Sequence, residues 1–239
     1  MIDLHCHLLP GIDDGAQTEE ESIGLLQQAI ADGITHMVLT SHVQPGRYNN
    51  NLNNLQIPFQ RLQEIVKERQ LTIKLSLGGE VRLCDEILQL FADDNIPFIG
   101  TYNNKKVLLL ELPHNSIPAG SDKLIDWLME RNILPMIAHP ERNKAIIDDI
   151  SKAKPFIMSG CLFQLTAMSV TGDFGKKAYG IAHQFLDQGL ATIIASDAHN
   201  SKRRPAILSK AFNHVAEKYS EALAKELLIE TPGRILACR

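Results

Sequence analysis

Seven short apolar runs alternate with longer amphipathic segments along this chain of 239 residues, and that alternation limits its possible folds more than any other feature. The runs are residues 2–7, 36–41, 73–78, 107–111, 135–139, 162–166 and 191–196. Most are continuously apolar, which is typical of parallel strands buried on both faces. Helices are predicted at residues 18–32, 55–69, 85–91, 121–131, 176–188, 205–218 and 220–228.

A strand followed by a helix, repeated about seven times, predicts an α/β protein built as a (β/α) barrel, with a doubly wound open sheet as the alternative. Hydrophobic residues make up 44% of the chain, enough for a sizeable buried core. No linker, repeat or low-complexity tract is visible, so residues 1–239 are expected to form one domain.

Local signals refine the predicted ends of elements. Thr18 and Glu21 have the spacing of a capping box at the start of the first helix. Residues 45–54 and 112–118 are polar or turn-rich and are predicted to be loops. Both follow predicted strands, and loops in that position on a barrel are where substrates usually bind.

Residues that can bind metals gather at the ends of the predicted strands. They are His5, His7, His42, Glu80, Glu111, His139, Asp197 and His199. The carboxyl ends of parallel barrel strands meet on one face, so these side chains are expected to converge. Unpaired carboxylates packed together would cost several kcal/mol each, and bound cations remove that penalty. The mixed nitrogen and oxygen donors suit Zn, Mn or Fe better than a calcium site.

The opening His5-Cys6-His7 fits this interpretation. Side chains alternate along a strand, so the two histidines share one face and Cys6 points to the other. Shortly afterwards comes Asp13-Asp14-Gly15, of which Asp14 is the favoured ligand.

The cysteines do not support a cysteine-based phosphatase, which needs an arginine six residues after its nucleophile. Ile12, Leu90 and Ala167 stand at that spacing from three of the four cysteines, and the fourth, Cys238, is too near the end. The four are scattered without a CxxC pair, which indicates reduced thiols rather than a disulfide framework.

Net charge and hydropathy limit the cellular compartment of the protein and the classes of partner that it can bind. The formal net charge is −4, with no basic footprint for nucleic acid. No secretory signal is visible, and the longest apolar stretches are too short to span a bilayer. A cytoplasmic protein that neither binds nucleic acid nor inserts into a membrane is expected, and its oligomeric state stays open.

Several motifs together resemble the PHP (polymerase and histidinol phosphatase) superfamily. They are MIDLHCHLLPGIDDGA, GITHMVLTSHVQPGRYNN, LGGEVRL, LLLELP, IAHPER and IIASDAHN, in order along nearly the whole chain. They are most similar to its bacterial tyrosine-protein phosphatase branch, the CpsB/CapC/YwqE type. The resemblance implies a distorted (β/α)7 TIM-like barrel, the PHP fold, with three divalent metal ions, Mn first and Fe or Zn as alternatives.

The resemblance also implies a division of the ligands. The first metal would take His5, His7, Glu80 and Asp197, the second Glu80 as a bridge with Glu111 and His139, and the third Asp14, His42 and His199. Arg142 matches an arginine that the family uses on phosphate, and Arg204 matches a second, with Arg203 as its near competitor. His42 or His199, or a bound water, would protonate the leaving group.

The implied activity is hydrolysis of phosphotyrosine by a metal-activated hydroxide. The implied partner is the tyrosine-rich tail of a bacterial tyrosine kinase that controls capsular or exopolysaccharide synthesis. The alternative is a PHP phosphoesterase acting on a small phosphomonoester such as histidinol phosphate; a nuclease-type PHP domain and a non-catalytic metal-binding regulator fit the residues less well. One departure bears on substrate preference, because Val43 stands where the family commonly has a second histidine.

Overall fold

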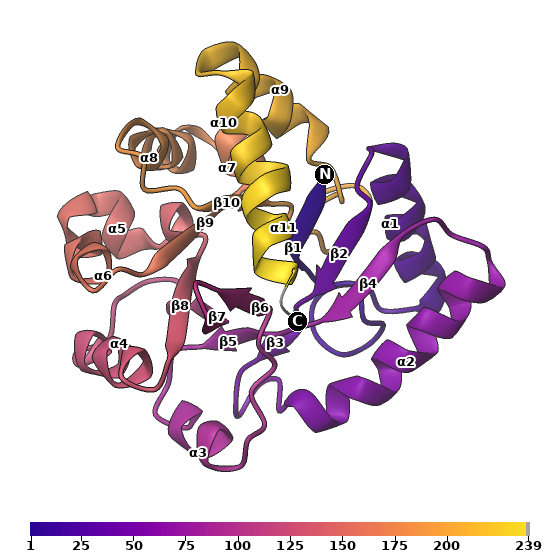
Figure 1. The fold of residues 1–239 in the computed structure, drawn as a ribbon, viewed down its shortest axis with the longest axis horizontal. Helices are drawn as coiled ribbons and strands as arrows, with labels where there is room; N and C mark the ends of the chain where they lie inside the picture. Colours follow the sequence, from indigo (N-terminus) through magenta and orange to yellow (C-terminus); the bar gives the residue numbers. More distant parts are fainter. Residues whose placement is uncertain (238–239) are drawn as a thin grey trace.

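The computed structural model describes residues 1–237, whose parallel strands form a closed ring surrounded by helices (Figure 1). One sheet has the order β1-β2-β4, and its strands are β1 (Ile2–Cys6), β2 (His36–Leu39) and β4 (Lys74–Leu77). The second has the order β10-β9-β8-β7-β5-β3. Its strands are β3 (His42–Val43), β5 (Glu80–Arg82), β7 (Lys105–Glu111), β8 (Ile133–Ala138), β9 (Leu162–Thr166) and β10 (Ile193–Ala195).

Backbone hydrogen bonds join these two sheets into a seven-stranded barrel. The amide of Gly78 donates to the carbonyl of Leu39 (2.9 Å), which bridges the short breaks between β2 and β3 and between β4 and β5. On the other side, His7 N donates to Ala198 O and Asp197 N to His5 O, both at 2.8 Å, which pairs β1 with the segment after β10. The predicted (β/α)7 barrel is therefore confirmed, and the open-sheet alternative is wrong.

The predicted helices are present with shifted ends. They are α1 (Glu19–Ala31), α2 (Leu52–Glu68), α3 (Ile87–Ala92), α4 (Ser121–Met129), α8 (Lys176–Asp187), α9 (Ser209–Lys218) and α10 (Glu221–Lys225). The structure adds α5 (Lys144–Asp148), α6 (Lys154–Met158), α7 (Ala167–Thr171) and α11 (Thr231–Leu236). Short turns of helix lie at η1 (Pro140–Arg142), η2 (Ile150–Ala153) and, as a π-turn, η3 (Glu226–Glu230). None of the helices in the described part of the chain is long and apolar enough to cross a membrane.

Capping side chains explain two differences from the sequence predictions. The loop predicted at 45–54 is too long, because Asn51 and Asn54 cap each other reciprocally and α2 begins at Leu52. At α1, Thr18 accepts from Glu21 N as predicted, but the Glu21 carboxylate accepts from Gln17 N (2.7 Å) instead of completing the box. A further strand, β6 (Gly100–Tyr102), pairs antiparallel with β7 through a turn in which Asn103 and Asn104 have positive φ.

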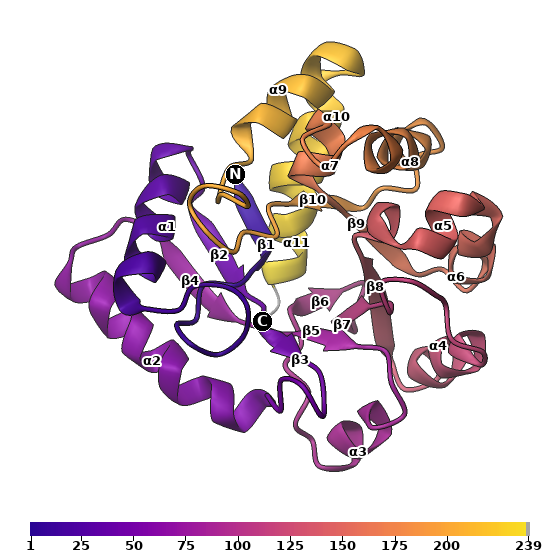
Figure 2. The same cartoon turned by 180° about the vertical axis from the view of Figure 1, so that it is seen from behind.

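The amino end of the barrel is closed by the last described helix. Val107, Leu109 and Met136 belong to a small buried cluster that also includes Ile235 of α11. Figure 1 shows α11 (yellow) lying across this end. A larger cluster packs the helices on the outside of the barrel. With one end closed by apolar side chains, polar chemistry is left to the other end, where the β1–α1 loop and the loop after β10 lie (Figure 2).

Candidate metal centre

All nine predicted metal ligands come together at the carboxyl ends of the barrel strands. Asp14, His42, Glu80, Glu111, His139 and Asp197 line a cavity of about 130 Å³, together with Arg47, Arg82, Arg142 and Arg204. His5, His7 and His199 lie buried at its base, each no more than 3% exposed. Convergence therefore holds for every candidate, although their role as ligands stays a prediction.

Glu80 is the centre of the cluster. Its Oε2 lies 3.4 Å from Nε2 of both His5 and His7 and 2.9 Å from His42 Nδ1. Its Oε1 lies 2.7 Å from His139 Nε2. One carboxylate at the first residue of β5 thus contacts four histidines from three parts of the chain, as a bridging ligand would.

Asp197 is the second shared carboxylate. Its Oδ1 lies 3.4 Å from Nε2 of His5 and of His7, while its Oδ2 accepts hydrogen bonds from Arg142 and Arg204. Arg204 therefore lines the cavity, whereas its competitor Arg203 is exposed and outside the lining. The Arg142 and Arg204 side chains keep 25% and 22% of their surface exposed, which leaves donors available to a ligand.

The loop after β1 carries two aspartates, one exposed and one buried. Asp14 is exposed, and its Oδ1 lies 3.3 Å from His42 Nε2 and 3.5 Å from His199 Nε2. Asp13 is buried and accepts from His7 Nδ1 and from His42 N, both at 2.8 Å. Glycine is required at position 15, directly after the two aspartates, because a Cβ there would lie 2.1 Å from His7 O.

Other buried side chains orient the histidines from behind. Gln164 Oε1 on β9 lies 2.9 Å from His5 Nδ1 and accepts from His139 N at 3.2 Å. A group on the second ring nitrogen fixes the orientation of a histidine and frees the first nitrogen for a metal. Asp13 does the same for His7, and His199 Nδ1 lies 3.0 Å from the backbone oxygen of Asp197, so three of the histidines carry such a partner.

Burial and mutual charge set the protonation of the cluster. Burial raises the pKa of Glu80, but His5, His42 and His139 outweigh it and hold that pKa well below its usual range. Burial lowers the pKa of His42, but the charge of Glu80 and hydrogen bonds to Asp14 and Glu80 together outweigh it and raise that pKa to about 9. Burial, reinforced by the charge of Glu80, raises the pKa of Glu111 to about 7. Protonated histidines thus neutralise the negative charge of the carboxylates. Bound cations would take over this role, because metal binding releases protons from the ligands.

Two of the candidate ligands have strained backbones. His139, directly after β8, has φ 32°, and Asp197, after β10, has φ 53°. A residue other than glycine in the left-handed region costs of order 1 kcal/mol or more and persists only where the surrounding fold imposes it. The strain lets each strand end turn its last polar side chain into the cavity.

Unpaired buried atoms test whether a metal fits here. Glu80 Oε2, Glu111 Oε2, Asp197 Oδ1 and His199 Nε2 are buried and form no well-aligned hydrogen bond, although His42 and Arg82 lie within ion-pair distance of the two glutamates. Buried polar atoms rarely lack a partner, so several in one cavity indicate a missing ligand. Four overlapping groups of donor atoms lie within 4.8 Å of one another, and their imidazole and carboxylate donors suit Mn, Fe or Zn.

These groups agree only in part with the predicted division. One contains His7 with Asp14, His42 and His199, which adds a residue to the predicted third metal. The others are His5, His7 and Glu80; His5, His139 and Asp197; and His42, Glu80 and Glu111. His139 therefore groups with His5 and Asp197 rather than with Glu111. Glu80 takes part in two groups, as a bridge does.

Sequence reasoning missed three residues of the site. Asp13 is passed over in favour of Asp14 as the ligand, Gln164 lies in the middle of an apolar strand, and Arg82 has no predicted role. The Arg82 Nε lies 3.1 Å from Glu111 Oε2, so it holds that carboxylate. The polar Gln164 within an otherwise apolar run was the one available signal.

The described cysteines have no nucleophilic character. Cys6 is fully buried and donates through Sγ to Val38 O. Burial raises the pKa of Cys6, and raises those of Cys84 and Cys161 to about 11 and about 12. Cys238 lies outside the described residues. A thiolate is required for nucleophilic attack, so these thiols are unsuited to that role.

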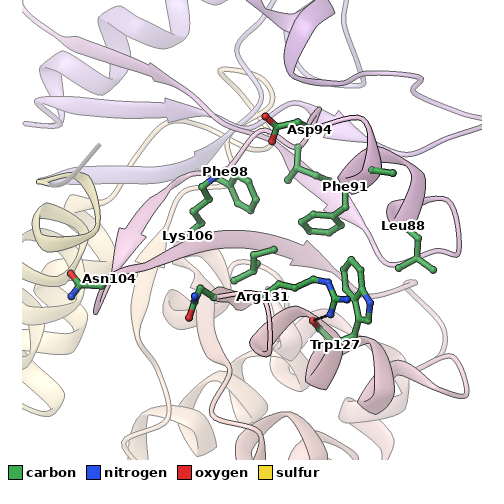
Figure 3. A pocket seen from close by; sticks show the side chains of 12 residues that line it. Leu88, Phe91, Asp94, Phe98, Asn104, Lys106, Trp127 and Arg131 are labelled. Carbon is green, nitrogen blue, oxygen red and sulfur yellow. Dashed lines mark hydrogen bonds between the residues drawn. The ribbon is translucent and has the colours of Figure 1, made fainter.

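A larger cavity, of about 530 Å³, lies near the amino ends of β7 and β8, away from the candidate ligands. Figure 3 shows Phe91, Trp127 and Arg131 at its wall; the Phe91 and Trp127 rings are 5.4 Å apart, and the Arg131 guanidinium lies 4.0 Å from the Trp127 centroid. Its lining includes one carboxylate, Asp94, and no histidine or cysteine. Cavity size alone would have pointed to the wrong end of the barrel.

Comparison with known proteins places this geometry in a family. The family described as "Capsular polysaccharide synthesis, CpsB/CapC" matches residues 1–237. The chain belongs to the CpsB/CapC family. CapC of Staphylococcus aureus is 37% identical over 213 residues, covering 89% of this chain and 82% of that protein. The tyrosine-protein phosphatase CpsB of Streptococcus pneumoniae is 31% identical over 242 residues, covering 99% and 98%.

A solved structure of the CpsB/CapC family has the same fold. It comes from crystal structures of YwqE from Bacillus subtilis and CpsB from Streptococcus pneumoniae, described as unique metal-dependent tyrosine phosphatases. The TM-score is 0.87 at 29% identity, over 94% of this chain and 90% of that one. The predicted PHP-type barrel and the predicted branch of the superfamily are both confirmed.

Proposed function

We propose that this chain, acting in the cytoplasm as one PHP domain, removes phosphate from tyrosines on a bacterial tyrosine kinase that controls capsular polysaccharide synthesis. The predicted enzyme class, a metal-dependent protein-tyrosine phosphatase without a cysteine nucleophile, is confirmed at the level of the family. The kinase tail as substrate, and three ions with Mn preferred over Fe or Zn, are the finer parts of the proposal.

One observation carries the proposal: six of the nine candidate metal ligands line a cavity of about 130 Å³ together with Arg142 and Arg204, and the other three lie buried against them. Pockets that enclose small-molecule ligands usually measure about 300–1,000 Å³. A site this small suits a phosphoryl group on a side chain that projects from a protein, with the tyrosine ring near the opening. A metabolite such as histidinol phosphate would need deeper enclosure.

The chemistry that divalent ions supply in such a site is activation of a water molecule as nucleophile and neutralisation of phosphoryl charge. Arg142 and Arg204 stand at the rim and present planar donors that match phosphate oxygens. Both already bind one carboxylate oxygen of Asp197, so they are held where an incoming anion would arrive. Glu80, Asp197 and the histidines would hold the ions, and Asp13 and Gln164 would orient His7 and His5.

The loop after β3 forms another wall of the opening. Tyr48 stacks on the ring of His42, with centroids 5.4 Å apart and planes 8° apart, and Arg47 lies over Tyr48. Asn50 Nδ2 donates to His42 O (2.8 Å), which ties this loop to the centre. We expect Arg47 and Tyr48 to flank the substrate tyrosine.

The proposal is tested by phosphate release from a phosphotyrosyl peptide, with Mn²⁺ or with a chelator. His5→Ala should abolish release, and Arg142→Ala should reduce kcat/KM about a hundredfold, the usual effect of losing one donor to transition-state charge. Arg204→Ala should behave like Arg142→Ala. Arg203→Ala is the matched control, since that arginine is adjacent but exposed, and it should match the wild type.

Release from the peptide in the presence of chelator would contradict the metal requirement. If no metal supports release from phosphotyrosyl peptides while histidinol phosphate is hydrolysed, the small-molecule alternative replaces the tyrosine assignment. Dephosphorylation of the purified kinase tail then tests the named partner.

A further inference from the structure

A second cleft adjoins the proposed phosphate site. Its volume is about 390 Å³, and its walls include His114, Arg142, Lys144, Asp148, Phe174 and Lys177. His114 and Arg142 line both this cleft and the cavity over the metal centre, so the two lie side by side. Side chains that neighbour a phosphotyrosine on a bound peptide would therefore meet these walls.

Arg142 forms the partition between the two spaces. One end of its guanidinium binds Asp197 in the metal centre, and its Cζ lies 4.8 Å from the centroid of the Phe174 ring. These two contacts fix the arginine from opposite sides. Its charge therefore acts on groups in both the cavity and the cleft.

The cleft has an excess of positive charge in a chain whose net charge is −4. Arg142, Lys144 and Lys177 line it, against the single carboxylate of Asp148. Lys144 and Lys177 are exposed and form no ion pair with any described residue. Burial, followed by the charges of Lys144, Arg142 and Arg82, lowers the pKa of His114, as expected where cations gather.

The wall between His114 and Lys144 is held in place by hydrogen bonds. Asn143 Nδ2 donates to Pro113 O (2.8 Å) and to Ser116 O (3.1 Å), and Lys144 N donates to His114 O (2.9 Å). The loop after β7 is thereby bound to the start of α5. A fixed wall keeps the cationic side chains beside the phosphate site and reduces the ordering cost of binding.

We propose that this cleft is a specificity subsite that binds an anionic group on the same peptide as the substrate phosphotyrosine. The group is a carboxylate or a second phosphate, carried one to three residues away, since an extended chain advances about 3.3 Å per residue. The inference rests on the proposed function and adds a preference to it: substrates with acidic or multiply phosphorylated surroundings are used best. Lys144 and Lys177 supply positive charge for this anionic group, which an isolated phosphotyrosine does not have.

The test compares three phosphotyrosyl peptides of equal length at saturating Mn²⁺. One has neutral neighbours, one carries glutamates at the neighbouring positions, and one carries a second phosphotyrosine. The wild type should have a lower KM for both anionic peptides, with similar kcat. Lys144→Gln and Lys177→Gln should each raise that KM about threefold and the double variant about tenfold, as expected for exposed ion pairs.

Two controls distinguish binding in the cleft from a long-range electrostatic effect of positive charge on the protein surface. Lys176→Gln removes the same charge from the neighbouring position of α8, outside the lining of the cleft, and should leave KM unchanged. All variants should hydrolyse p-nitrophenyl phosphate like the wild type, because it has no neighbouring side chains. Lys177→Glu should in turn prefer a peptide whose glutamates are replaced by lysines.

The outcomes are distinct. Equal KM for neutral and anionic peptides, or an equal effect of Lys176→Gln and Lys177→Gln, overturns the subsite while the phosphatase function stands. A preference for the glutamate peptide alone, or for the doubly phosphorylated peptide alone, supports the subsite and identifies its ligand. Failure to hydrolyse any of the three peptides refutes the proposed function itself.

Discussion

Asp13 is the residue on which the structure makes its sharpest prediction. Its Oδ2 accepts from His7 Nδ1 and from His42 N, and its Oδ1 accepts from Gly15 N at 2.9 Å. One buried carboxylate thus orients a candidate ligand, positions a second and closes the loop that carries Asp14. Asp13→Asn keeps the shape of this side chain and changes only its hydrogen bonding and charge.

The cost of Asp13→Asn follows from counting donors. An asparagine has one acceptor oxygen and one NH₂ group, so if the oxygen serves His7 and His42, the NH₂ faces the Gly15 N–H. A buried donor left unpaired costs about 1–3 kcal/mol of stability. Loss of the carboxylate behind a metal-binding histidine lowers metal affinity about 10- to 100-fold, or about 1.4–2.7 kcal/mol.

The assay is activity against free Mn²⁺ concentration, with binding measured in parallel by calorimetry. The apparent Kd for Mn²⁺ should rise 10- to 100-fold in Asp13→Asn, and most of the activity should return at saturating Mn²⁺. Asp122→Asn, on the exposed first turn of α4, is the control and should titrate like the wild type. An unchanged Mn²⁺ titration in Asp13→Asn would refute the reasoning, because it would mean that the contact with His7 does not tune the site.

Three further predictions concern stability. Chelation should lower the Tm, and Mn²⁺ should restore it, because Glu80 and Asp197 otherwise face each other across buried histidines; a Tm insensitive to chelator would contradict a bound ion. Burial raises the pKa of Asp3 to about 6, so its ionisation destabilises the fold. In chelator, the wild type should therefore lose up to about 3 kcal/mol relative to Asp3→Asn as the pH rises from about 4 to about 6, and parallel pH profiles in urea unfolding would exclude this. Gly100→Ala should cost more than about 2 kcal/mol, since the new Cβ would lie 2.3 Å from Ile235 O and push α11 off the barrel end. Gly180→Ala, with open space around it on α8, is its control and should be neutral or stabilising in the same urea experiment.

The barrel and the set of candidate ligands were predictable because both depend on local pattern. Continuous apolar runs mark strands buried on both faces, and their carboxyl ends point to one side whatever the exact packing. A histidine or carboxylate at such an end, as at Glu111 or His139, needs no further information to be placed near the others. This is why every candidate ligand lies in the cluster.

Features that depend on contacts between distant segments were missed. The cap formed by Asn51 and Asn54 shifts α2 into a segment that reads as loop, and β6 exists only because β7 offers it an edge. Asp13 looks like a turn residue until the chain brings His7 and His42 to it. Gln164 looks like a defect in an apolar strand until closure of the barrel brings His5 of β1, with only β10 between the two strands, to its side chain.

The sequence by itself determined where the barrel strands lie along the chain, the end of the barrel that carries the chemistry and the types of donor atom available there. Those follow from hydrophobic period and from residue identity, which are local. The tertiary structure decided which donors share a cavity, that Glu80 and Asp197 stand at its centre, and that Arg204 rather than Arg203 faces it. Such choices depend on backbone strain at His139 and Asp197 and on distances of a few ångströms between segments far apart in the chain, which no pattern along one strand encodes.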